Sequence, residues 1–118
     1  MRRRRWRFYE TVSGAKPVQA FLDKLTATEA AEVVAAMKEV PREGLRFARH
    51  LRGDIWEVRV QAERKAYRVL FSPEGRSQQV LLALEAFAKK TQKTPTRTIE
   101  LAERRLSDWR SRGRTGSR

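Results

Sequence analysis

The feature that most constrains this chain is a short apolar run, residues 80–84, which leads directly into a cluster of lysines. The run is too short for a typical helix and polar residues bound it, so it predicts a buried strand. The lysines are Lys89, Lys90 and Lys93, with Phe87 just before them. A buried strand that brings ammonium groups to the edge of a sheet holds cations in fixed positions, which suits a phosphate-rich partner.

The charge of the whole chain agrees with such a partner. Lys and Arg number 27 against 14 Asp and Glu, which gives a net charge of +13. Eight arginines lie in residues 1–5 and 110–118, and subtracting these eight leaves +5 for residues 6–109. A basic body with an embedded cluster points to nucleic acid or another polyanion. We expect one folded domain over residues 6–109, between a flexible basic N-terminus (1–5) and a disordered basic tail (110–118).

The chain has no cysteine, which excludes disulfides, thiol catalysis and cysteine-ligated zinc and fits a reducing compartment. No apolar segment follows the arginines at the start, so they do not form a secretory signal. The apolar runs are too short to span a bilayer. We therefore expect a cytoplasmic protein without a membrane partner.

Helical patterns occur in three places. Pro17 opens a predicted helix that runs to about residue 25, and Thr26 with Glu29 forms a capping box for a second helix. Pro41 and the glycine at position 44 are expected to end that helix near residue 40. Thr94 and Pro95 suit the N-cap and first position of a last helix, which we expect to end at residue 109.

Strand patterns fill the rest of the chain. Alternation predicts strands over residues 6–12, 55–60 and 67–71, and the apolar run predicts another over residues 79–87, with a turn at residues 72–75. Residues 45–51 are ambiguous between extended and irregular structure. The predicted fold class is therefore α+β. A helical hairpin follows the N-terminal strand and packs on a mostly antiparallel sheet of about four strands, and a helix ends the domain.

Two arginines are the first candidates for chemistry. Arg59 and Arg68 lie on successive strands of a predicted hairpin, each on the face opposite the aromatic residues. Together with the lysines they would bind a phosphodiester and stabilise the extra charge of a pentacoordinate transition state. The alternative is that both arginines are solvated and paired with Glu57 or Glu85.

Aromatic and titratable side chains add further candidates. Phe87 and Tyr67 would stack on a base, or else belong to the core. Glu57 and Glu85 are candidate bases, or else they orient the arginines. His50, the only histidine, is more typical of a surface residue than of a general base. The sequence contains no legible metal-ligand cluster, phosphate-binding glycine loop or Ser/His/Asp set, and we expect no cofactor.

Several motifs resemble a known family. WEVR at 56–59, YRVLF at 67–71 and LLALEAFAKKTQKTP at 81–95 are similar to the HigB-like, phage-related branch of the RelE/ParE toxin superfamily. The opening WRFYETVSGAKPVQAFLDKL and the closing IELAERR are similar as well. The resemblance covers roughly residues 6–109 and implies a small RelE-like domain.

The resemblance also implies an activity. Such proteins are toxins of type II toxin–antitoxin pairs, and the RelE and HigB kinds cut mRNA in the ribosomal A site without a metal. The 2′-OH of a ribose attacks the adjacent phosphate, which requires a base, an acid and cations. Carried over by motif, Arg59 and Arg68 would hold the phosphate. Lys89 and Lys90 would add cationic stabilisation, and one of them would serve as acid or base.

The implied RNA contacts include Phe87, Lys93, Tyr67 and Glu85. The implied partners are the ribosome with its mRNA and a cognate antitoxin, a helix-turn-helix protein, which would cover the active face or hold the last helix. Contact with DNA is left open and would run only through the antitoxin complex.

The chain departs from the family pattern at Glu85, where many members of this branch have histidine. A carboxylate there would serve as base or weaken the nuclease. Two alternative functions also remain open, namely a ParE-like inhibitor of DNA gyrase and a non-catalytic RNA- or DNA-binding module.

Overall fold

The computed structural model describes residues 4–62 and 64–116 of the chain. Within this part, three α-helices, one 3-10 turn and five strands follow one another along the chain. In order, the elements are β1 (Arg5–Phe8), α1 (Pro17–Asp23), α2 (Ala27–Glu43), the 3-10 turn η1 (Leu45–Phe47), β2 (Arg49–Arg52), β3 (Ile55–Gln61), β4 (Ala66–Glu74), β5 (Val80–Ala88) and α3 (Thr96–Gly116).

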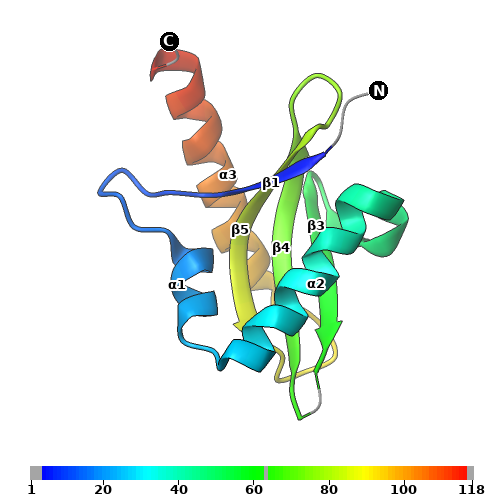
Figure 1. Cartoon of the computed structure of the whole chain (residues 1–118). Coiled ribbons are helices and arrows are strands. Elements are labelled where there is room, and N and C mark those ends of the chain that lie inside the picture. Colours follow the sequence, from blue (N-terminus) through cyan, green and yellow to red (C-terminus); the bar gives the residue numbers. More distant parts are fainter. Residues whose placement is uncertain (1–3, 63, 117–118) are drawn as a thin grey trace.

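The strands form a single sheet in the order β1-β5-β4-β3-β2. Strand β1 pairs with β5 in parallel, and the other neighbours are antiparallel. Helices α1 and α2 lie on one face of this sheet, and α3 crosses the other face (Figure 1). The α+β fold predicted from the sequence is therefore confirmed. The sheet has five strands rather than about four because residues 49–52, in the ambiguous segment, pair with β3.

Each face of the sheet has its own apolar core. Val58, Val69 and Phe71 pack beneath α1 and α2, against Val33 and Met37 of α2. On the other face, strand residues Ile55, Leu70, Leu82 and Leu84 pack against Ala102 and Leu106 of α3. The predicted apolar stripe of the last helix thus faces the sheet. Burial on both sides explains why β4 and β5 are almost continuously apolar in sequence.

Helix α2 begins as predicted and ends later than predicted. Its capping box is complete, with Glu29 N donating to Thr26 Oγ1 and Thr26 N donating to Glu29 Oε1. The helix continues through Pro41 to Glu43. A proline at this position cannot donate the usual hydrogen bond to the carbonyl of Met37. The indole of Trp6 donates to that carbonyl instead, at 2.8 Å, which satisfies the acceptor from outside the helix.

The connection between β4 and β5 also differs from the prediction. Ser72, Pro73 and Glu74 extend β4 and pair with β5, and the turn begins only at Gly75, whose φ is +95°. The turn predicted at residues 72–75 therefore begins later than expected. Proline is compatible with a strand at a position where its nitrogen would not donate an inter-strand hydrogen bond. The longer strand places Glu74 where its carboxylate, buried to 8% exposure, accepts hydrogen bonds from Ser72 and from Arg110 of α3.

The predicted chain ends differ from the structure in two places. Arg5 already belongs to β1, and α3 continues past Trp109 to Gly116. Arg110 is held by Glu74 at 2.7 Å and by Asp54 at 3.1 Å, so the predicted tail begins as anchored helix. The remaining residues of the two predicted tails, 1–3 and 117–118, lie outside the described residues. No helix of the described chain is both long and apolar enough to cross a membrane.

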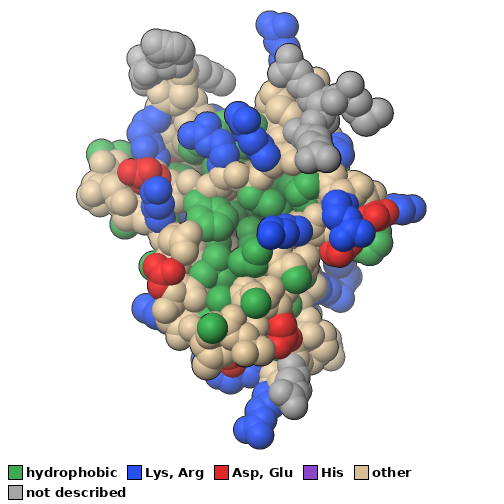
Figure 2. Space-filling model, viewed as in Figure 1, with side chains coloured by type: hydrophobic (Ala, Val, Ile, Leu, Met, Phe, Trp, Pro, Cys, Tyr) green, Lys and Arg blue, Asp and Glu red, His purple; other side chains and the backbone are tan. Residues whose placement is uncertain are grey.

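The helical face of the molecule is mixed in character. Apolar side chains gather in its middle, and Lys and Arg side chains stand around them (Figure 2). Trp6, Phe8 and Phe21 are among the partly buried apolar side chains packed against the core on this side. The candidate chemistry lies on the opposite face, beyond the end of β5, where the chain turns toward α3 (Figure 1).

Candidate functional site

A β-bulge in β5 determines which side chains face the site. Leu70 pairs with Glu85 but Phe71 pairs with Ala83, so Leu84 is the extra residue. Without it, strict alternation would turn Glu85 and Phe87 toward α1 and α2. With it, both follow Leu84 onto the face of α3, where Phe87 packs against the core. Arg105 of α3 donates to the carbonyl of Leu84 at 2.7 Å and to Glu85 Oε1 at 3.1 Å, which anchors the bulge.

The two predicted arginines are direct neighbours across β3 and β4. Arg59 pairs with Arg68, and Arg68 in turn pairs with Phe87 of β5, so the three side chains form one row across the sheet. The arginines differ in exposure. The side chain of Arg59 is 46% exposed, whereas that of Arg68 is 3% exposed. Only Arg59 therefore presents its guanidinium broadly to solvent.

Glu57 lies at the centre of a buried network that holds both arginines. It is 1% exposed, and its Oε1 accepts from Arg59 Nε at 3.0 Å. Its Oε2 accepts from Arg68 Nη1 at 3.1 Å and from the hydroxyl of Thr94. Two guanidinium groups beside one carboxylate leave a net positive charge. Of the two roles predicted for Glu57, the structure shows the second, in which its carboxylate orients the arginines. Glu85 instead pairs with Arg105.

The lysine-bearing segment, residues 89–95, is fastened to the sheet by the same network. Arg68 donates to Thr94 Oγ1 and to the carbonyl of Gln92, both at 3.1 Å. The backbone nitrogen of Lys89 donates to the carbonyl of Ala66 at 2.8 Å, and its ammonium donates to Gln92 Oε1 at 3.1 Å. We call Glu57, Arg68, Thr94 and the Gln92 carbonyl the loop clasp. It gives an irregular, lysine-rich loop a defined position.

The sequence prediction for Thr94 was wrong about its partner. Its hydroxyl belongs to the loop clasp and does not cap α3. Helix α3 begins at Thr96, and the carbonyl of Pro95 accepts its first intrahelical bond, from Ile99 N at 3.2 Å. Threonine followed by proline is typical of a helix start, which is why the sequence predicted a cap. The partner of Thr94 is instead a buried carboxylate on a distant strand, and the local sequence does not indicate that contact.

Two hollows flank residues 92–94. The first, about 440 Å³, is lined by Arg49, His50, Arg59, Lys93 and neighbours from β2 and α3. The second, about 380 Å³, is lined by Arg68, Glu85, Phe87, Lys90, Lys93 and neighbours from the loop and α3. Lys93 lies between them and lines both. A larger hollow of about 590 Å³, between the β2–β3 turn and the C-terminal half of α3, contains none of the predicted residues.

His50 lies in the first hollow, together with cationic side chains that sequence spacing did not connect to it. It is opposite Trp56 in the β2–β3 pair, with ring centroids 5.0 Å apart. Its Nε2 lies 2.7 Å from the carbonyl of Gly53. The surface location expected from the sequence is correct, since the side chain is exposed. Its place beside Arg59 depends on β2, which the sequence left ambiguous.

Of the four predicted RNA contacts, Tyr67 is the one that lies outside the site. It is 2% exposed and lies on the opposite face, under α1, where its ring meets Phe21 edge-on at 5.9 Å. Burial, with the nearby Glu29 carboxylate, raises the pKa of Tyr67. Its alternation with Val69 and Phe71 already indicated the core, and a buried ring cannot stack on a base.

The described residues include no group of three or more His, Asp or Glu side chains placed to hold a metal ion. Around the loop clasp, the site combines the cations Arg59, Lys89, Lys90 and Lys93 with the aromatic ring of Phe87 and the carboxylate of Glu85. Such a set can neutralise phosphates and contact a base.

Known proteins are similar in sequence to this chain over most of its length. The family of phage-derived Gp49-like proteins matches residues 20–107. The probable endoribonuclease HigB1 of Mycobacterium tuberculosis, in strains CDC 1551 / Oshkosh and ATCC 25618 / H37Rv, is 33% identical over 108 residues. The alignment covers 89% of this chain and 84% of each relative. The family match by itself includes β2 to β5, the lysine-bearing loop and the first half of α3. The chain belongs to the phage-derived Gp49-like family, in the HigB-like branch that its motifs predict.

Proposed function

We propose that this protein is the toxin of a type II toxin–antitoxin pair and cuts mRNA on the ribosome without a metal ion. The observation that carries the proposal is the group of cations on a loop whose position is fixed by the loop clasp, in a chain whose relatives are named probable endoribonucleases. A loop of lysines held by buried hydrogen bonds meets a phosphate with little reorganisation, which is the requirement for stabilising a transition state.

The proposed reaction needs only the chain's own side chains. The 2′-oxygen of a ribose forms a bond to the adjacent phosphorus while a basic side chain takes its proton. The bond from phosphorus to the 5′-oxygen then breaks, leaving a 2′,3′-cyclic phosphate on the upstream fragment. Arg59 contacts the phosphate, and Arg68 adds positive charge behind it. Lys89 and Lys90 stabilise the phosphorane, and one of these ammonium groups protonates the leaving oxygen.

The proposed partners follow from the same chemistry. A net charge of +13 favours a polyanion such as the ribosome with its mRNA. A toxin of this kind also requires a cognate antitoxin, for which we propose a helix-turn-helix protein. Co-expression of that protein should restore growth to cells that the toxin arrests.

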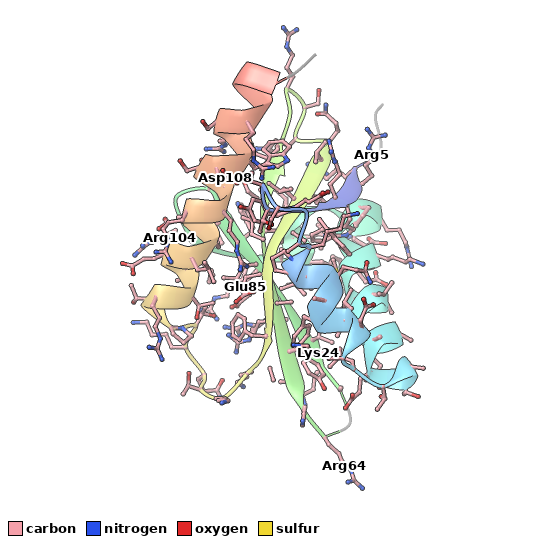
Figure 3. All side chains as sticks on the ribbon, turned by 90° about the vertical axis from the view of Figure 1, so that its left-hand side faces the viewer. Arg5, Lys24, Arg64, Glu85, Arg104 and Asp108 are labelled. Carbon is pink, nitrogen blue, oxygen red and sulfur yellow. The ribbon has the colours of Figure 1, made fainter. Side chains whose placement is uncertain are left out.

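The proposal is tested by mapping cuts in a reconstituted translation reaction. The wild type, dialysed against a chelator beforehand, is compared with Arg59→Ala and with Arg104→Ala, a control whose exposed side chain lies on α3 (Figure 3). We expect ribosome-dependent cuts with 2′,3′-cyclic phosphate ends from the wild type and the control. Arg59→Ala should cut about 100-fold more slowly or worse.

Other outcomes would favour the alternatives. Normal translation with uncut mRNA would reject the nuclease, and inhibition of DNA supercoiling by the same sample would favour a gyrase inhibitor. Tight RNA binding without cuts would favour a non-catalytic module, in which Arg59→Ala lowers affinity only modestly and in a salt-dependent way.

A further inference from the structure

The second hollow differs from the rest of the basic site in its lining. Phe87, Ala88 and Pro95 give it an apolar wall, and its volume of about 380 Å³ is in the range of small-molecule pockets. Lys90 and Lys93, both exposed, lie at its edge on the loop. An apolar wall with ammonium groups beside it matches a nucleotide, whose base is flat and whose phosphate is anionic.

Among the described residues, Glu85 is the only acidic side chain that lines this hollow. It points into the space between β5 and α3 (Figure 3). Its Oε1 is occupied by Arg105 Nη1 at 3.1 Å and by the backbone nitrogen of Ala86 at 3.2 Å. Within the described residues, no hydrogen bond of the protein reaches Oε2. A carboxylate whose orientation is fixed at one oxygen presents the other as an acceptor.

The geometry points to a base-binding pocket in which Glu85 selects a nucleobase that carries an exocyclic amino group. This inference rests on the proposed function and adds its sequence preference. Adenine, cytosine and guanine each carry such a donor, which a carboxylate oxygen can accept. Uracil presents carbonyl oxygens on both sides of its single N–H, and these oxygens are repelled by a carboxylate.

The proposed selection of a nucleobase by Glu85 depends on the β-bulge in β5. Glu85 and Phe87 share a face because they are two residues apart, and the bulge turns that face toward α3, so the ring and the carboxylate border one hollow. Arg68 also lines the hollow, but its Nη1 and Nη2 donate to Glu57, Thr94 and the Gln92 carbonyl. The acceptor that remains for a base is therefore Oε2 of Glu85, because Arg105 engages Oε1.

The test measures binding of the four nucleoside 5′-monophosphates to the whole protein by NMR titration, independently of any cleavage. We expect AMP, CMP and GMP to bind about tenfold more tightly than UMP, because a hydrogen bond to a charged group is lost with uracil. Glu85→Gln should reduce that ratio to about twofold or less, since one end of the amide is a donor. Phe87→Leu should weaken all four nucleotides alike.

The matched control is Glu100→Gln, the same chemical change at an exposed position of α3 that does not line the hollow. It should keep the tenfold ratio. Equal affinities for all four nucleotides, no binding at millimolar concentration, or an unchanged ratio in Glu85→Gln would overturn the inference. If the preference is found but the translation reaction yields no cuts, the pocket stands and the proposed nuclease fails.

Discussion

At the scale of single residues, Glu57 explains most of how the site is built. It is almost fully buried, and removing a partner from a buried charge is more damaging than replacing the whole set. Its two arginines come from adjacent strands, and Thr94 comes from the loop. Orientation of the arginines by Glu57 was one of two roles predicted from the sequence, but the hydrogen bonds of Thr94 are evident only in the tertiary structure.

Thr94 gives the first prediction. Thr94→Val keeps the shape of the side chain but leaves Glu57 and Arg68 each without one hydrogen bond. We expect the free energy of unfolding to fall by about 1–3 kcal/mol, with a slower cleavage rate at saturating RNA because the loop loses its position. Thr94→Ser, which restores the hydroxyl, should recover both. Chemical denaturation and single-turnover rates provide the measurements. A rate in Thr94→Val equal to that of the wild type would contradict the role of the clasp.

The contact between Trp6 and α2 gives a second prediction. Trp6→Phe removes the donor to the Met37 carbonyl, and we expect the free energy of unfolding to fall by about 1–3 kcal/mol. Pro41→Ala supplies a backbone N–H to the same carbonyl. It should therefore stabilise the Trp6→Phe protein more than it stabilises the wild type. Denaturation of the four proteins of this double-mutant cycle measures the difference, and simple additivity would refute the shared acceptor.

At the scale of elements, the helices and most strands were predictable because their periodicity is local. The bulge in β5 was not, because Leu81 to Leu84 are apolar on both faces and show no alternation that could be broken. The sequence therefore identified Arg59, Arg68, Phe87 and the lysines as candidates, but it could not orient Glu85. Strand β2 was missed for a related reason, since its basic and exposed residues lack an apolar face.

Helix α3 is fastened at its far end by a polar cluster. Asp108 accepts hydrogen bonds from Tyr9 at 2.6 Å and from Arg112 at 2.7 Å. The Tyr9 hydroxyl and the Arg112 guanidinium lower the pKa of Asp108 below its ordinary value of 3.8. A lowered folded-state pKa contributes stability above pH 3.8 that is lost as the pH falls through the folded value.

Asp108→Asn should therefore be less stable than the wild type at neutral pH, and the two should converge as the pH falls below 3.8 and through the lowered pKa of Asp108. Unfolding followed by circular dichroism across this pH range measures the effect. A constant difference between Asp108→Asn and the wild type at all pH values would contradict the linkage.

At the scale of the whole molecule, Lys and Arg side chains surround the apolar middle of the helical face (Figure 2), and on the opposite face Arg68 holds the lysine loop through hydrogen bonds to Thr94 and to the Gln92 carbonyl. Binding of single-stranded RNA should weaken steeply with salt, because each neutralised phosphate releases counterions. Lys90→Ala should reduce the slope of log affinity against log salt by about 0.7. Lys38→Ala, an exposed change on α2, should not, and equal slopes for both variants would argue against the loop as the RNA contact.

The central claim is that the clasped lysine loop performs phosphate chemistry on ribosome-bound mRNA, and single-turnover cleavage tests it most directly. The measurement compares the wild type with Lys90→Ala, which removes one of the two ammonium groups proposed to stabilise the phosphorane, and with Lys24→Ala, an exposed lysine after α1 (Figure 3). The account predicts a rate lower by about 100-fold in Lys90→Ala at saturating protein, with Lys24→Ala unchanged. Equal rates in the two variants, or no cleavage by the wild type, would contradict it.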